Sequence, residues 1–449
     1  MARVNSQTFR PGDNILFKRG QEWRETLVVS HSGVEREPIT FGGFGTGPNP
    51  RIWCSDLFAR WTLEVDQSPI KIWKTGPGGL HSTWGAMRNG SRVPCYLSHA
   101  TKSPSPWQPP PNLTAMSNGF FYAPRRTGTC YFRWDAGDPG PMEIGTRDYG
   151  IYIKGQQYVV IDGIDVHGPG GRLGGWGPDI YGQVCILASH HVVVKNSHLA
   201  FHSSSGVTVG GSTGHTELNC TDCKLENLEV DGHGDTGIYF KTGGYNHSVL
   251  ACTVHDCGTV ITDYGDMGLV GIWQTPHVSI EASYFSNNAH FGAVRADAAI
   301  SFVQSPFGTV NRCLIKNAAT TALQFAEASD NGTAAYNIID GWGTSRVAAQ
   351  SHDEGIRIGG GSGPSANNCR VYNNLFINGG KTQGRWAALR VLNQKNLGLR
   401  VINNVFYNNV GVFEVIAESS SNFADWVFAS NCYFRTTGQA VEYQRQVYG

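Results

Sequence analysis

The sequence predicts an all-β fold in which short strands stack, coil upon coil, into a solenoid. Two strand-like phrases recur along residues 149–449, and the first of them returns with a mean step of about 30 residues. No helical periodicity of useful length accompanies these phrases. A fixed step of this length is typical of stacked supersecondary units rather than of a single globular core.

The first phrase is a small polar residue, one spacer and a large apolar residue. Its copies are Ser197-His198-Leu199, Cys223-Lys224-Leu225, Cys252-Thr253-Val254, Ser283-Tyr284-Phe285, Cys313-Leu314-Ile315, Asn337-Ile338-Ile339, Asn374-Leu375-Phe376, Asn404-Val405-Phe406 and Cys432-Tyr433-Phe434, with Ile164-Asp165-Val166 as an earlier, degenerate copy. Equivalent positions of stacked coils lie one above another, so the small residues are expected to form an internal column in which asparagines hydrogen-bond along the axis.

The second phrase has the form Gly-apolar-x-apolar. It appears at 150–153, 206–209, 237–240, 268–273, 292–295, 322–325, 355–358 and 388–391, with Ala in place of Gly in two copies. Alternation places one side of each strand inside the stack and the other side toward solvent. Short strands, a step of this size and an internal column together predict a parallel β-helix of about 10 or more coils.

The chain divides into three segments. Residues 1–53 contain short runs of alternating apolar and polar residues, interrupted by Gly and Pro. This pattern is typical of strands and turns and predicts the first coil. Residues 54–148 interrupt the repeat with a Pro- and Trp-rich stretch and predict an inserted subdomain. Residues 149–449 form the repeat array.

Two N-terminal segments resemble the opening coil of the right-handed parallel β-helix (pectate-lyase-like) superfamily. They are Pro11-Gly12-Asp13-Asn14-Ile15-Leu16-Phe17-Lys18 and Pro38-Ile39-Thr40-Phe41-Gly42. Gly119-Phe120-Phe121-Tyr122 and Thr129-Cys130-Tyr131-Phe132 are similar to the excursion that follows that coil. The resemblance covers nearly the whole chain and implies a right-handed helix and action on polysaccharides. It does not choose a reaction, because one fold hosts many chemistries.

The equal numbers of basic and acidic residues argue against some classes of binding partner. Lys+Arg and Asp+Glu both number 35 among 449 residues, which argues against a nucleic-acid or membrane partner attracted by net charge. No apolar run is long enough for a transmembrane helix. The first residues lack the apolar segment of a secretion signal, and we expect an extracellular protein whose leader is absent from this chain. The sequence leaves open whether it is a monomer or a homo-oligomer.

The 11 cysteines do not predict a metal site. The spacings Cys220-x2-Cys223 and Cys252-x4-Cys257 are of the kind that binds zinc. However, Cys223, Cys252, Cys313 and Cys432 occupy the small position of the first phrase, so we interpret them as buried members of the internal column. Disulfides between neighbouring coils stay an open alternative.

Ionisable residues gather at the outward positions of the second phrase in the central coils. The alignment of the phrases puts Asp235 level with Asp266, and Asp297 level with Glu327, in adjacent coils. Stacked carboxylates about 5 Å apart suit a retaining glycosidase, and offset ones suit an inverting enzyme. Like charges so close raise one pKa, which keeps a general acid protonated. We therefore expect glycoside hydrolysis by this group.

The lyase alternative uses the same face. β-Elimination from a uronic acid needs a base and a cation that neutralises the sugar carboxylate, for which Lys241, Arg295 and Arg357 are candidates. Asp235 and Asp266 would supply oxygen ligands if a lyase used Ca²⁺, although no cofactor is firmly indicated. A non-catalytic glycan-binding spike is the third alternative.

Further residues near this face are expected to bind the sugar chain. They comprise aromatic platforms and polar groups: His233, Tyr239, Tyr264, Trp273, His290, Asp353, Glu354, Arg357 and, from a Gly/Pro-rich loop, Trp176. Gly232-His233-Gly234 and Arg357-Ile358 echo polygalacturonase motifs, but they lie four coils apart and Gly359 stands where that family has Lys. That family's catalytic assignment is therefore not transferred.

Overall fold

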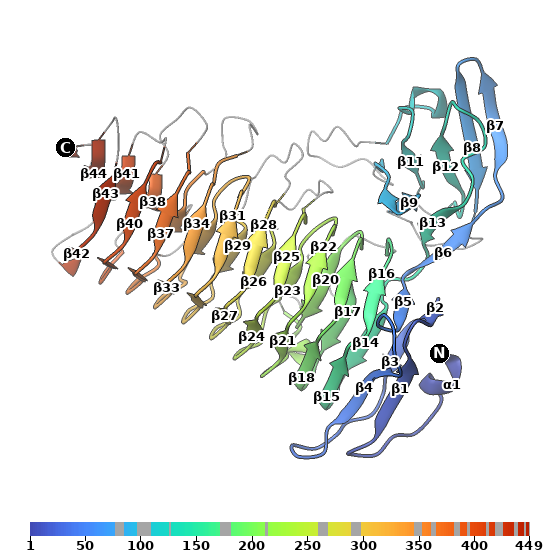
Figure 1. The fold of residues 1–449 in the computed structure, drawn as a ribbon, viewed down its shortest axis with the longest axis horizontal. Helices are drawn as coiled ribbons and strands as arrows, with labels where there is room; N and C mark the ends of the chain where they lie inside the picture. The colour runs from blue at the N-terminus through green and yellow to red at the C-terminus, as the bar shows by residue number, and fades with distance from the viewer. Residues whose placement is uncertain are drawn as a thin grey trace.

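The protein is an elongated solenoid with an antiparallel subdomain at its N-terminal end (Figure 1). This computed structural model describes residues 1–76, 85–96, 109–124, 127–170, 181–211, 214–258, 268–288, 298–344, 353–360, 365–380, 387–392, 396–409, 413–417, 425–434, 439–443 and 446–448. Within these residues, three long parallel sheets run the length of the solenoid, which confirms the predicted parallel β-helix.

Each coil contributes one strand to each sheet, in the order sheet A, sheet B, sheet C. Sheet A contains β1 (Asn14–Lys18), β4 (Ile39–Phe44), β15 (Gln157–Asp162), β18 (His190–Lys195), β21 (Lys224–Glu226), β24 (Ser248–Leu250), β27 (Ser279–Glu281), β30 (Thr309–Asn311), β33 (Thr333–Ala335), β36 (Arg370–Tyr372), β39 (Arg400–Ile402) and β42 (Val427–Ala429).

Sheet B contains β2 (Glu22–Trp23), β5 (Arg51–Trp53), β16 (Asp165–His167), β19 (His198–Ala200), β22 (Glu229–Asp231), β25 (Thr253–His255), β28 (Tyr284–Ser286), β31 (Leu314–Lys316), β34 (Ile338–Asp340), β37 (Leu375–Ile377), β40 (Val405–Tyr407) and β43 (Cys432–Phe434).

Sheet C contains β3 (Leu27–Val29), β14 (Ile151–Lys154), β17 (Gly182–Leu187), β20 (Ser205–Val209), β23 (Ile238–Phe240), β26 (Val270–Trp273), β29 (Ile300–Val303), β32 (Leu323–Ala326), β35 (Ile356–Ile358), β38 (Ala387–Val391), β41 (Phe413–Ala417), β44 (Gln439–Tyr443) and β45 (Gln446–Tyr448), the last pairing antiparallel.

Residues between β5 and β14 leave the solenoid and form two antiparallel sheets. One is β6 (Ser55–Phe58), β13 (Met142–Gly145), β9 (Ala86–Arg88) and β10 (Ser91–Arg92); the other is β7 (Thr62–Gln67), β8 (Ile70–Thr75), β12 (Cys130–Arg133) and β11 (Phe121–Tyr122). A four-residue helix, α1 (Ala2–Asn5), and two 3-10 turns at Leu113–Ala115 and Thr216–Leu218 are the described helical pieces.

The core consists of inward columns, because residues that are Cα partners in successive strands stack directly. Phe376, Phe406 and Tyr433 illustrate this, with parallel rings 4.8 and 5.0 Å apart between centroids. These distances equal the ordinary spacing of neighbouring strands, about 4.8 Å. Each fully buried ring contributes roughly 1.5–3 kcal/mol of stability.

The corner between sheets A and B explains the first phrase. One residue there takes a left-handed backbone, such as Asn373 with φ of 56° and Asn403 with φ of 57°, and the next side chain turns inward. Asn374 donates through Nδ2 to Oδ1 of Asn404 over 3.0 Å, and Asn404 donates to Asn431 over 3.0 Å. The predicted asparagine column is therefore present.

Two copies of the first phrase were assigned to the wrong position. Cys223 precedes β21 of sheet A, and Leu228 fills the column position in that coil. Asn431, rather than Cys432, continues the column below Asn404, and Cys432 is exposed. All 11 cysteines lie in the described residues and are free thiols, most of them buried.

Two copies of the second phrase also need correction. In the coil after β26, sheet C is formed by Ile300–Val303, whereas the expected strand at 292–295 lies outside the described residues. Ile238 pairs with Val270, so Gly237 lies level with Leu269 and not with Gly268. Asp266 lies outside the described residues, so its predicted equivalence with Asp235 stays a prediction.

Candidate functional site

The outer face of sheet C carries a row of mostly polar residues, interrupted by one glycine, which we call the sheet C row. Its members are Cα partners on six successive strands, β23 to β38: Tyr239, Gly271, Ser301, Gln324, Arg357 and Arg390. Although the row faces outward, Ser301 is 1%, Gln324 2% and Arg357 7% exposed. Buried polar groups are costly unless they are satisfied, so this face is a candidate binding surface.

An ionisable cluster lies at the Tyr239 end of the row. Asp235 precedes β23 and is 3% exposed, and Lys241 follows the same strand. Burial raises the pKa of Asp235 to about 7, while the charge of Lys241 partly opposes the rise. Burial also lowers the pKa of Lys241, against the attraction of Asp235. The two shifts bring the pKa values of this carboxyl and this amine closer together, a feature that is common at functional sites.

The aromatic ring of Tyr239 fixes the arrangement around Lys241. The Lys241 Nζ lies 5.0 Å from the centroid of the Tyr239 ring, within cation–π range. Across the row, a Cβ on Gly271 would lie 3.0 Å from the ring, so a side chain at this position would push the ring aside. Glycine in β26 therefore makes room for Tyr239.

The inserted subdomain anchors the segment that carries Asp235. Arg92, in β10, donates through Nη1 to the carbonyl oxygens of His202 and Gly232, at 3.3 and 3.0 Å. Gly234 packs so closely that a Cβ would lie 2.2 Å from the Ser203 carbonyl oxygen. The loop before β23 is therefore held from the N-terminal side, which positions Asp235 against the row.

A second cluster occupies the other end of the row. Glu354, which has no exposed side-chain surface, accepts from Arg390 Nη1 over 2.7 Å and from Thr321 Oγ1 over 2.6 Å. Arg357 donates to Gln324, whose amide donates to Ser301. Among the described residues Arg357 has no carboxylate partner, and its Nε has no hydrogen bond. It is a nearly buried cation with one neutral acceptor.

The two clusters are too far apart to act on one bond. Asp235 belongs to the coil of β23 and Glu354 to that of β35, four strand steps along sheet C. Four steps of about 4.8 Å separate them by roughly 19 Å. Carboxyl pairs of glycosidases lie about 5–9.5 Å apart, so these two carboxylates do not form such a pair.

Most described residues predicted for the site lie on this face. Tyr239, Lys241 and Trp273 lie at its Asp235 end, and Asp353, Glu354 and Arg357 lie at the other end. Six predicted residues lie outside the described residues: Trp176, Tyr264, Asp266, His290, Arg295 and Asp297. Their predicted roles stay predictions.

Two predicted residues lie elsewhere. Glu327 follows β32 at a left-handed corner toward sheet A, where its Oε2 accepts from Gln304 over 3.2 Å. Gln304, not Asp297, is thus its neighbour in the preceding coil, and the carboxylate pair was wrongly aligned. His233 is structural: one ring nitrogen contacts the Leu199 carbonyl oxygen at 3.0 Å and the other accepts from the His202 amide at 3.3 Å.

Sequence reasoning missed Ser301 and left Gln324 and Arg390 out of the site. Their positions in the row follow from the strand register, and Ser301 was hidden because a competing Gly-apolar-x-apolar phrase stands at 292–295. The alternation in Ile300-Ser301-Phe302 is the signal that finds it.

Within the described part of the chain, no group of three or more His, Cys, Asp or Glu side chains is placed to hold a metal ion. No helix among the same residues has the length and apolar character needed to cross a membrane.

Comparisons with known proteins agree on the architecture. The family described as "Right handed beta helix region" matches residues 182–376, somewhat less than half of the chain. Among solved structures, XylC in complex with xylose is 13% identical with a TM-score of 0.55, covering 95% of this chain and 81% of its own. No curated protein matches the sequence.

Two further solved structures are similar at lower scores. An alginate lyase from Paenibacillus sp. str. FPU-7 is 11% identical with a TM-score of 0.42, covering 98% of this chain and 95% of its own. DFA-IIIase from Arthrobacter chlorophenolicus A6, without its lid, is 12% identical with a TM-score of 0.44, covering 65% and 71%. Together with the three parallel sheets, the family match and the XylC likeness identify the chain as a right-handed parallel β-helix protein.

Proposed function

We propose that the protein is an enzyme that cleaves a glycan bound along the outer face of sheet C, and we favour glycoside hydrolysis. The observation that carries this proposal is the buried Asp235, whose pKa of about 7 keeps a proton available near neutral pH. A carboxylic acid held in this way can protonate the oxygen of the leaving sugar. The solved structure of XylC, which has the same fold, is that of a complex with xylose. This supports a carbohydrate as the ligand of the present protein.

The hydrolytic mechanism needs a second carboxylate within about 5–9.5 Å of Asp235. Since Glu354 is too distant, we propose that Asp266 or Asp297 supplies it. In this scheme Asp235 donates its proton as the glycosidic bond breaks, and the second carboxylate either attacks the sugar carbon or activates water. Tyr239 and Trp273 line the row as stacking surfaces for the sugar rings.

A specific observation favours β-elimination as the second candidate. Arg357 is a nearly buried guanidinium that has no carboxylate partner among the described residues, and a uronic acid would provide the missing negative charge. Lys241 belongs to the other cluster, so it would act on a different uronic acid of the same polymer and remove the proton next to that sugar's carboxylate. A carbon–carbon double bond would form, the bond to the leaving sugar oxygen would break, and that oxygen would take the proton held by Asp235. This scheme assigns no role to Ca²⁺, and Asp235 and Asp266 stay the predicted oxygen ligands if a lyase uses it.

The decisive experiment assays wild type, Asp235→Asn and Asp340→Asn on neutral and acidic polysaccharides with product sizing. Asp340 is a matched control because it lies on sheet B with Lys316 at 3.8 Å. We expect Asp235→Asn to lose about 10²–10⁴-fold in turnover and Asp340→Asn to retain activity. Wild-type turnover should fall as pH rises through about 7, when Asp235 loses its proton.

The products discriminate between the alternatives. Hydrolysis gives saturated sugars, whereas elimination gives an unsaturated sugar that absorbs in the ultraviolet. Full activity in Asp235→Asn, with melting unchanged, would overturn the assignment of Asp235. Binding without any product from the whole panel would favour a glycan-binding spike.

A further inference from the structure

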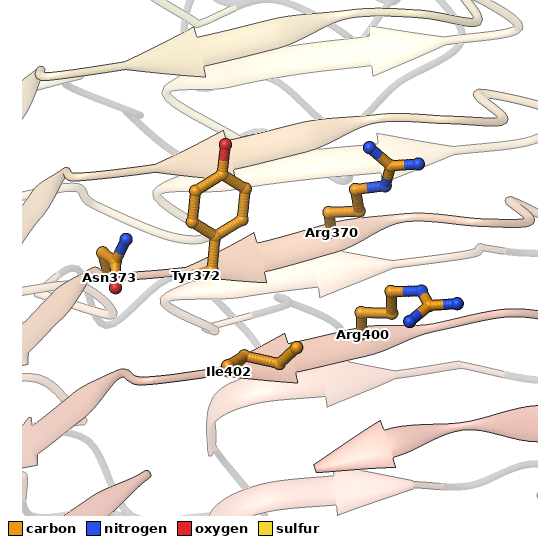
Figure 2. A pocket seen from close by; sticks show the side chains of 5 residues that line it. All are labelled: Arg370, Tyr372, Asn373, Arg400 and Ile402. Carbon is orange, nitrogen blue, oxygen red and sulfur yellow. The ribbon is translucent and has the colours of Figure 1, made fainter. Parts of the chain in front are cut away.

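A second candidate site lies on the outer face of sheet A, away from the sheet C row. Arg370 in β36 and Arg400 in β39 are Cα partners on adjacent strands, as are Tyr372 and Ile402. With Asn373 these residues line a pocket of about 390 Å³. Figure 2 shows both guanidinium groups at one end of the two strands and Tyr372, Ile402 and Asn373 at the other.

The two arginines are exposed and have no counter-charge among the described residues. Their strand neighbours in sheet A are Thr333 before Arg370 and Val427 after Arg400, so each arginine has the other as its only charged Cα partner in these strands. Strands lie about 4.8 Å apart, so two like charges repel across the pocket.

Three other cations on the outer faces each have a carboxylate partner. Lys195 lies 3.4 Å from Asp162, and Lys316 lies 3.8 Å from Asp340, in each case a Cα partner on the neighbouring strand. Arg312 forms an ion pair with Glu281. The Arg370–Arg400 pair therefore lacks the internal neutralisation that these three cations have, and a bound anion would supply it.

An aromatic pair adjoins the pocket through Tyr372. The rings of Tyr336 and Tyr372 meet edge to face with centroids 5.8 Å apart, and Tyr336 is 56% exposed. Aromatic faces next to guanidinium forks suit a ligand that combines a ring with an oxyanion. A sugar bearing a carboxylate or a sulfate has this combination.

We propose that the Arg370–Arg400 pocket is a secondary binding site for an acidic polysaccharide, whose carboxylate or sulfate groups pair with the two guanidinium groups. The choice of a glycan as occupant rests on the proposed function, whereas the anion specificity rests on the pocket itself. The site would retain polymer on a face that takes no part in cleavage.

The test compares wild type with Arg370→Gln/Arg400→Gln and with the matched control Lys195→Gln/Lys316→Gln, which removes two paired cations. Retention is measured by affinity electrophoresis in gels containing polygalacturonate, a sulfated galactan or neutral arabinoxylan. We expect wild type and control to be retained by an acidic polymer, and the arginine variant to bind at least about tenfold more weakly. Retention should weaken with added salt.

Three results would overturn the proposal: equal retention of the arginine variant, no retention of wild type by either acidic polymer, or stronger binding to anionic lipid vesicles than to polymer. Displacement of polymer by low concentrations of inorganic sulfate would show a small-anion site and also count against it. Turnover on short oligosaccharides is measured in parallel. The arginine variant should match wild type there, so failure of this site is distinguishable from failure of the proposed function.

Discussion

The outer faces of sheets C and A are built from the same coils but handle charge in opposite ways. On sheet C, Glu354 and Arg357 are almost completely enclosed, and Glu354 forms an ion pair with Arg390 over 2.7 Å. On sheet A, Arg370, Arg400 and Arg312 stand in solvent. Removing the charged side chains on sheet C from water costs free energy, whereas water screens the charges of the side chains on sheet A. A repetitive scaffold thus reserves burial of charge for one of these two faces.

The largest expected difference comes from removing one carboxylate on each face. Glu354→Gln leaves Arg390 without its buried ionic partner and should cost about 3 kcal/mol of unfolding free energy. Glu281→Gln, which breaks the exposed pair with Arg312, should cost less than about 1 kcal/mol. Denaturant unfolding of both variants measures the difference, and equal losses would remove the contrast between the faces.

A second comparison sets the interior asparagines against those on the surface. Asn374→Ala removes the acceptor of the Asn337 amide and the donor to the Ala334 carbonyl oxygen, so buried groups lose partners and stability should fall by about 3 kcal/mol. Asn378, at φ of 56°, donates to Asp340 on the exposed corner.

Because glycine tolerates that backbone, Asn378→Gly should cost less than about 1 kcal/mol. Thermal melting of both variants checks the ranking. If the surface change were the more damaging one, the column would not be the stabilising element proposed here.

The last comparison concerns a buried histidine that follows β23 of sheet C. Burial lowers the pKa of His247 to about 4, while its ring stacks on Phe240 with centroids 5.0 Å apart. A histidine in the unfolded chain has a pKa near 6.5. Between that pH and about pH 4, His247 is therefore protonated in the unfolded chain but neutral in the folded protein. Stability therefore falls from about pH 6.5 toward pH 4, by up to about 1.4 kcal/mol per pH unit.

His247→Asn should make the acid limb of the stability profile shallower by that amount. The Asn oxygen offers the Cys223 amide an acceptor in place of Nδ1, so the fold should tolerate the change. Denaturant unfolding at several pH values between 4 and 7 measures the slope. An unchanged slope in the variant would mean that His247 is protonated in the folded protein.

The sequence was sufficient for the architecture because each coil repeats the same local requirement: a left-handed corner residue followed by a small or amide side chain. The same requirement caused the errors. Cys223 follows the corner between sheets C and A, where its Sγ contacts the Ser189 and Thr221 carbonyl oxygens, and so it imitates the phrase of a different corner. At the last described coil, Asn431-Cys432 offers two suitable residues in succession.

The candidate site was harder to predict than the fold. Tyr239 and Arg357 were placed on this face because alternation alone decides which way a strand residue points, and Asp235 and Lys241 were placed there because they flank the strand of Tyr239. Glu327 was misplaced because a shift of one residue moves a side chain from the sheet face to the corner. The depth of burial of the row could not be foreseen, since it depends on what packs over the strands rather than on the strands themselves.

The asparagine column gives the solenoid a polarity. Each side-chain oxygen accepts from the coil before it: Cys313 donates to Asn337, Asn337 to Asn374, Asn374 to Asn404 and Asn404 to Asn431. A coil therefore completes the hydrogen bonding of its predecessor and leaves its own amide for its successor. If the coils fold in order from the N-terminal end, each new coil would complete the side-chain hydrogen bonds of the coil before it. A misfolded coil would then affect only the coils that follow it.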